Sequence, residues 1–192
     1  MQVVLFLFVL LGVPAKAQTT WAPVGAMWIY SVGSYWGEYS YEDRLTVVGE
    51  TLIQGLPCRQ IDFEIPLCGS GFVNSIHMRS SGDGVYWYDE VSDTLRLLIP
   101  FDAQQGSSWR VPVYSDTALF TVDSVDVVDF DGQQLRRLHV SQEFTVGMGF
   151  LFTQDTGSFT ERLGNSYFML PWFWPCSDSD MPGGLICYSD PE

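Results

Sequence analysis

Lysine is almost absent from this sequence. Its one lysine, Lys16, lies near the N-terminus, and the rest of the 192-residue chain has only arginine to oppose 23 acidic residues. The formal net charge is −14. Because phosphate binding needs clustered Lys and Arg, so acidic a chain is expected to repel nucleic acid and anionic membranes. Solubility is the simplest use of this charge, and binding of calcium or of a cationic partner is the alternative.

The motifs of common enzyme classes are also missing. The sequence contains no GxSxG, no HExxH and no Gly-rich phosphate loop that ends in Lys. Its only histidines, His77 and His139, lie in segments of alternating polarity, which is typical of strand residues on a polar face. No CxxC pair exists and both histidines are far from any cysteine, so zinc is not expected. We expect no catalytic residue and no cofactor.

No apolar run reaches the roughly 20 residues that a membrane-spanning helix needs. The run from Val3 to Val13 is too short. Ala15 and Ala17 then supply small residues at the two positions that a signal peptidase inspects. Residues 1–17 are therefore expected to be a secretory signal peptide. The expected localisation is secreted or cell-surface, with no membrane span.

The remaining sequence consists of short runs rich in β-forming residues, and no helical period of useful length occurs. Asp83-Gly84 and Asp131-Gly132 each separate two such runs, which is typical of tight hairpin turns. About ten strands in consecutive hairpins predict one all-β domain over residues 18–192, an antiparallel meander that forms a barrel or sandwich. Within it, Gly147–Phe152 and residues 165–184 are expected to be loops.

Cysteine is scarce but even in number. An even count in an exported chain favours two disulfides and no free thiol. Sequence spacing suggests two local loops, although four cysteines allow three connectivities and the sequence does not choose among them. The local pairs would be Cys58–Cys68 and Cys176–Cys187.

Aromatic side chains give the clearest indication of a binding surface. Adjacent aromatic residues on a strand point to opposite faces, so some rings must be exposed or covered by a loop. Exposed rings stack on sugars and other ligands, whereas buried rings would simply fill a core of large side chains. The residues that we expect in a ligand-binding groove are Trp36, Trp87, Trp172 and Trp174.

One glutamate and one pair of aspartates support alternative functions. Glu161 could be the general acid of a hydrolase that acts on extracellular glycans, and its structural alternatives are pairing with a nearby arginine or a backbone-capping role. Asp178 and Asp180 precede Gly183-Gly184 with a spacing similar to a calcium loop. The bidentate Glu of an EF-hand is missing, which favours a solvated turn over a calcium site.

The order of several short motifs resembles a known family. They are Gly25–Tyr30 (GAMWIY), Gly49–Cys58 (GETLIQGLPC), Gly106–Trp109 (GSSW), Glu161–Gly164 (ERLG) and Gly184–Tyr188 (GLICY). This series is similar to the GAxWxY, GDTxIxGxxC, GDxW, EGIG and GLxCYxD pattern of uncharacterised exported proteins of Bacteroidota. The resemblance covers nearly the whole mature chain and implies an exported domain without implying an activity.

The resemblance has two further implications. Members of the family often carry a C-terminal type IX secretion sorting domain, which is absent here, so the chain would be a fragment or would use another route of export. The family pattern also matches Cys58 and Cys187, which implies a long-range Cys58–Cys187 bridge as a rival to the local pairs.

Taken together, the sequence favours an exported, non-enzymatic β-domain. It would bind an extracellular ligand or protein, or serve as a structural module at the cell surface. A glycan hydrolase that uses Glu161 is the alternative.

Cleavage of the signal peptide gives a direct test of export. We expect the mature protein to begin at Gln18, because Ala15 and Ala17 satisfy the small-residue rule at the cleavage site. Intact-mass analysis of exported material measures this N-terminus, and an exported form that retains Met1 would contradict the expectation.

Overall fold

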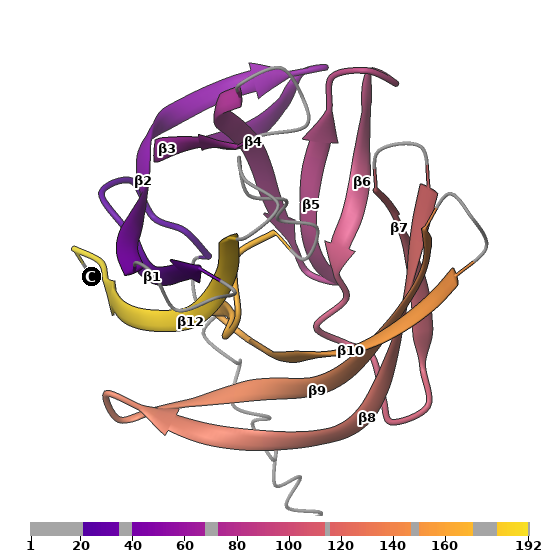
Figure 1. Cartoon of the computed structure of the whole chain (residues 1–192). Helices are drawn as coiled ribbons and strands as arrows, with labels where there is room; N and C mark the ends of the chain where they lie inside the picture. Colours follow the sequence, from indigo (N-terminus) through magenta and orange to yellow (C-terminus); the bar gives the residue numbers. More distant parts are fainter. Residues whose placement is uncertain are drawn as a thin grey trace, which may run out of the picture.

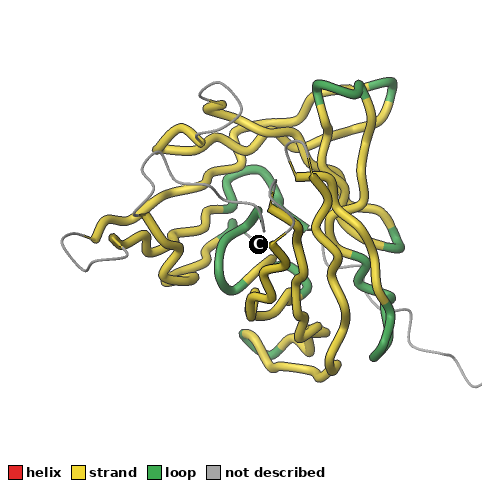
Figure 2. The backbone as a smooth tube through the Cα atoms, turned by 45° about the vertical axis from the view of Figure 1, so that its right-hand side comes forward, coloured by secondary structure: helices red, strands yellow, loops and turns green. Residues whose placement is uncertain are grey.

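The computed structural model describes residues 21–34, 40–67, 73–113, 116–146, 150–170 and 180–191. These residues form twelve β-strands joined by turns, with no helix among them (Figure 2), which confirms the all-β prediction. The predicted signal peptide lies outside the described residues. The strands are β1 (Met27–Ser34), β2 (Ser40–Ile53), β3 (Leu56–Leu67), β4 (Val73–Ser81), β5 (Gly84–Asp89), β6 (Thr94–Ile99), β7 (Ser108–Val113), β8 (Asp116–Phe130), β9 (Gln133–Val146), β10 (Phe150–Thr160), β11 (Gly164–Asn165) and β12 (Asp180–Ser189).

The strands build two antiparallel sheets that curl around one core (Figure 1). One sheet has the order β12-β1-β2-β3-β4-β5-β6, and the other has the order β11-β10-β9-β8-β7. Most neighbours are consecutive in the chain, as a meander requires, but β12 returns to pair with β1. The N–H of Leu185 on β12 also donates to the carbonyl of Ser166, just after β11, over 2.7 Å. The two sheets therefore meet at this side of the molecule as well as through the chain that joins β6 to β7.

Both predicted hairpins form, but the β4–β5 turn consists of Gly82 and Asp83, one residue before the predicted Asp83-Gly84. At the β8–β9 turn, Asp131 and Gly132 have φ angles of 51° and 75°, the left-handed conformation that a two-residue hairpin turn favours. At the β4–β5 turn, Gly84 opens β5, and a Cβ there would collide with the carbonyl oxygen of Ile99. Glycine at this position is therefore required by the close approach of β6.

The two segments expected to be loops are partly strands. Phe152 belongs to β10 and pairs with Phe144 of β9, while Asp180 begins β12 and pairs with Ser34 of β1. Residues 147–149 and 171–179 lie outside the described residues. Glycines and prolines mark these segments as irregular, but pairing with β9 in the first segment and with β1 in the second overrides that local preference.

Large aromatic side chains fill the space between the sheets. Trp28 and Tyr30 from β1, Phe120 from β8 and Phe159 from β10 are fully buried. The polar atoms of the β1 rings are hydrogen-bonded, because Trp28 Nε1 donates to the carbonyl of Leu163 and the Tyr30 hydroxyl to the carbonyl of Asn165. These bonds attach β1 to β11 and to the residue just before it, and burial raises the pKa of Tyr30.

The junction between β6 and β7 is built differently. Each is the last strand of its sheet, so no backbone ladder joins them within the described part of the chain. A side chain joins them instead: Trp109 Nε1 on β7 donates to the carbonyl of Leu98 on β6 over 3.0 Å. The Trp109 ring also stacks on Phe120, with centroids 5.3 Å apart. The seam between β6 and β7 is thus held by one indole and by apolar packing.

A buried ion pair holds three distant parts of the chain together. Arg162, in the turn after β10, donates from Nε and Nη2 to the two carboxylate oxygens of Asp190, each over 2.7 Å. Its Nη1 donates to Gln133 at the start of β9, and the Tyr188 hydroxyl also donates to Asp190. The side chains of Arg162 and Asp190 are only 7% and 4% exposed. The β10–β11 turn, the β8–β9 hairpin and the end of β12 therefore depend on one guanidinium.

Removal of this guanidinium should destabilise the whole domain. Arg162→Ala leaves the Asp190 carboxylate buried without its counter-ion, and loss of one partner from a buried pair typically lowers the free energy of unfolding by about 3–5 kcal/mol. Urea denaturation measures the change. Arg137→Ala is the control, because its ion pair with Asp126 is exposed and should contribute little. Equal losses for the two variants would show that the Arg162 pair has no special role.

Candidate functional site

Trp87 is the one predicted ligand-binding tryptophan that lies within the described residues. It sits in the middle of β5, is partly buried, and packs against the core from the inner face of its sheet. The other three expected members of the groove, Trp36, Trp172 and Trp174, lie outside the described residues. The groove itself stays a prediction. Of its four tryptophans, the structure describes the surroundings of Trp87.

Strand register places two arginines in line with Trp87. Trp87 pairs with Met78 of β4 on one side and with Arg96 of β6 on the other. Met78 pairs in turn with Arg59 of β3, and Arg59 pairs with Glu50 of β2. Directly opposite residues of antiparallel strands share a face. These five residues form a continuous row, the Trp87 row, on the face that Met78 buries in the core.

Each arginine of the Trp87 row is paired with a carboxylate. Arg96 Nε lies 2.7 Å from Asp89 Oδ2, and Arg59 Nη1 contacts Glu50 Oε1. The side chains of Arg96 and Arg59 remain 34% and 23% exposed. Burial raises the pKa of Asp89, but hydrogen bonds from Ser92 and Arg96 outweigh this effect and lower it overall. Asp89 is therefore a stable anion that fixes the position of Arg96.

This arrangement combines three kinds of contact in one place. The indole of Trp87 offers a flat apolar surface, the guanidinium groups offer donors in a fixed plane, and the carboxylates offer acceptors. A sugar ring presents the complementary groups, with an apolar C–H face and hydroxyls that both donate and accept. The Trp87 row therefore has the composition of a small polar-ligand site with an aromatic platform.

The sequence analysis missed the arginines beside Trp87. Part of the row was within reach of prediction, because a two-residue turn at 82–83 fixes Met78 opposite Trp87. Arg59 was not, since its alignment with Met78 depends on the connection between β3 and β4 and on a shift in register after Asp62. No local pattern encodes such a shift.

Glu161, the candidate general acid, makes backbone contacts. Its carboxylate oxygen Oε2 accepts the N–H of Arg136 over 2.8 Å, and its own N–H donates to the carbonyl of Arg136 over 2.9 Å. The side chain thus extends the pairing between β9 and the turn that follows β10. This contact with a backbone N–H is the backbone-capping role, one of the two structural alternatives expected for Glu161.

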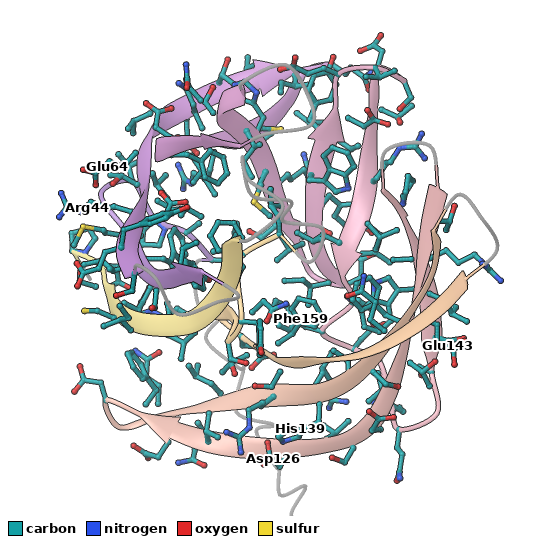
Figure 3. All side chains as sticks on the ribbon, in the orientation of Figure 1. Arg44, Glu64, Asp126, His139, Glu143 and Phe159 are labelled. Atoms are coloured by element: carbon teal, nitrogen blue, oxygen red, sulfur yellow. The ribbon has the colours of Figure 1, made fainter. Side chains whose placement is uncertain are left out.

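The histidines lie on strands, as predicted. His139 is on β9, where its Nε2 lies 3.4 Å from Asp126 Oδ2, and Arg137 donates two hydrogen bonds to the same carboxylate. These bonds, with that of Arg137 the strongest, lower the pKa of Asp126 to about 2. Figure 3 shows Asp126 and His139 on the outer side of β8 and β9, away from Phe159 in the interior. His77, on β4, lies edge-on to Tyr88 at 6.5 Å.

The calcium alternative is only partly covered by the structure. Asp178 lies outside the described residues, and of Asp180 only the backbone is described, as the first residue of β12. Across the described ranges, no group of three or more His, Cys, Asp or Glu side chains is placed to hold a metal ion.

Two of the four cysteines are described, and both carry free thiols in this structure. Cys58 on β3 is buried and Cys187 on β12 is exposed. Burial raises the pKa of the Cys58 thiol, although nearby Arg79 acts in the opposite direction. Cys68 and Cys176 lie outside the described residues, so the expected pair of disulfides stays a prediction.

The strand order nevertheless restricts which partners Cys58 can have. β1 and β2 lie between β12 and β3, so Cys187 and Cys58 are separated by three strand spacings, roughly 14 Å, whereas disulfide Cα atoms lie within about 7 Å. β3 also carries the chain away from Cys58 as far as Leu67, a span of roughly 25–30 Å for an extended strand. The strand order therefore counts against a Cys58–Cys187 bridge.

Comparison of the chain with protein-family models, with curated proteins and with solved structures found no match. No helix in the described ranges is long and apolar enough to cross a membrane. The evidence for function therefore comes from the residues themselves.

The state of Cys58 can be tested by thiol labelling. We expect a maleimide to modify Cys58 only after unfolding, because its side chain is buried between the strands of a paired sheet. Peptide mapping by mass spectrometry, with and without denaturant, gives the result. A Cys58–Cys187 linked peptide from non-reduced protein would contradict this arrangement of strands.

Proposed function

We propose that this chain is an exported β-domain that binds a carbohydrate or a chemically similar polyhydroxylated ligand at the Trp87 row. The observation that carries the proposal is the alignment of an aromatic ring with two arginine–carboxylate pairs on one face of one sheet. The expected secretory signal and the resemblance to exported Bacteroidota proteins support an extracellular location, where such ligands occur.

The local geometry supports binding better than catalysis. Stacking on Trp87 needs only a flat ring, and the fixed fork of Arg96 can donate to neighbouring hydroxyls. The alternative, a glycan hydrolase with Glu161 as general acid, needs a carboxyl group free to reach a glycosidic oxygen. The Oε2 atom of Glu161 instead accepts the N–H of Arg136, which makes the hydrolase the weaker proposal.

The test begins with a glycan array on the mature protein, followed by calorimetry with the best ligand. We expect Trp87→Ala to weaken binding by at least tenfold, because the ring supplies most of the apolar contact area. Arg96→Lys should also weaken binding while it keeps a cation beside Asp89, since an ammonium cannot reproduce the planar fork.

Two control variants make the result specific. Tyr167→Ala removes an aromatic residue that is 39% exposed elsewhere on the surface and should leave binding unchanged. Trp109→Ala removes a core ring and should lower stability by about 3–5 kcal/mol. Unchanged affinity in both Trp87→Ala and Arg96→Lys would rule out this site, and glycan cleavage that Glu161→Gln abolishes would establish the hydrolase instead.

A further inference from the structure

Two turns that are distant in sequence lie side by side at one end of the first sheet. Gln54, in the β2–β3 turn, donates from Nε2 to the backbone carbonyl of Asp93 over 2.6 Å and to its carboxylate over 3.2 Å. Asp93 belongs to the β5–β6 turn. Figure 1 shows both turns together at the upper edge of the molecule. The curl of the sheet therefore brings their side chains onto one surface.

Each of these turns exposes an aliphatic side chain. Val91 in the β5–β6 turn is 98% exposed, and Leu52 at the end of β2 is 72% exposed. Turns usually carry Gly, Asn, Asp or Ser, each for a conformational reason that does not apply to valine. Two large apolar groups at adjoining tips mark a candidate interaction surface, because burial of each on binding would be favourable.

The β5–β6 turn is held in place before any partner binds. Asp89 accepts the N–H of Val91 over 3.1 Å, the hydroxyl of Ser92 over 2.6 Å and Nε of Arg96 over 2.7 Å. The Tyr88 hydroxyl donates to Asp93 over 2.7 Å. Val91 is thus presented on an ordered turn, so little conformational entropy remains to be lost when it is buried.

The surroundings of the two aliphatic groups are acidic. Glu90 is exposed next to Val91, and Asp93 follows two residues later. The hydrogen bond to Asp93 raises the pKa of Tyr88, and the charges of Asp93, Glu90 and Asp89 add to this effect. Arg96 compensates Asp89, which leaves the carboxylates of Glu90 and Asp93 to set the local potential.

We propose that Leu52, Gln54, Glu90, Val91 and Asp93 form a docking surface, the turn-tip surface, for a protein partner whose contacting segment combines lysine or arginine with aliphatic side chains. Charge complementarity selects this partner. A second copy of the chain would bring the same carboxylates together, and each copy carries a net charge of −14. The proposal concerns a protein partner at the turns and is independent of ligand binding at the Trp87 row.

The experiment uses a fluorescently labelled peptide of alternating Lys and Leu as the probe, with the matched Glu and Leu peptide as its control. Binding to the mature protein is measured by fluorescence anisotropy at physiological salt. We expect Val91→Ser and Leu52→Ser each to weaken binding of the Lys and Leu peptide about tenfold, as truncation of a central apolar contact does. Glu90→Gln should weaken binding and reduce its dependence on salt.

Val127→Ser is the matched control, because Val127 is 58% exposed on β8 and is also close to acidic residues, Asp126 and Asp129. It should leave binding unchanged, and thermal melting should show that every variant is folded. The proposal would be overturned if Val91→Ser and Leu52→Ser bound the Lys and Leu peptide as tightly as the unmodified protein does. It would also be overturned if Val127→Ser lost as much affinity as these two variants. Dimerisation that Val91→Ser abolishes would make a second copy the occupant and would also overturn it.

Discussion

The buried pair of Arg162 and Asp190 is the interaction on which the closure of this fold depends. Pairing of β12 with β1 brings the two ends of the meander together within one sheet, but the end of β12 must also be held against the other sheet. Arg162 supplies this long-range contact, because its donors reach Asp190 near the C-terminal end and Gln133 in the β8–β9 hairpin. Arg162 has a φ of 68°, a left-handed backbone conformation that is unfavourable for arginine. The contacts of its side chain account for a backbone held in this conformation.

Aromatic residues have two roles in this domain, and strand position separates them. Trp28, Tyr30 and Phe120 face the centre of the core, where their burial stabilises the two curled sheets. Trp87 faces the same interior from β5, but its neighbour on β6 is Arg96, and Met78 on β4 separates it from Arg59 on β3. The same inner face thus changes from a packed core to a polar row within a few residues.

The parts of the structure that could be predicted from sequence are the local ones. Asp-Gly turns and β-rich runs indicate hairpins because each is decided within a few residues, and the Asp131-Gly132 turn is formed as expected. The pairing of β12 with β1 joins opposite ends of the chain, so no local pattern predicts it. The Trp87 row and the contact of Gln54 with Asp93 depend on strand register and sheet curl, which no short pattern encodes.

The seam between β6 and β7 gives the domain an uneven resistance to opening. Separation of β8 from β9 would break a long ladder of backbone hydrogen bonds, whereas separation of β6 from β7 breaks the Trp109–Leu98 bond and some apolar contacts. Fluctuations of the barrel should therefore concentrate at this seam. Arg96 and Asp89 lie on or beside β6, so opening at the seam would widen access to the inner face beside Trp87 without disturbing the ladder of β8 and β9.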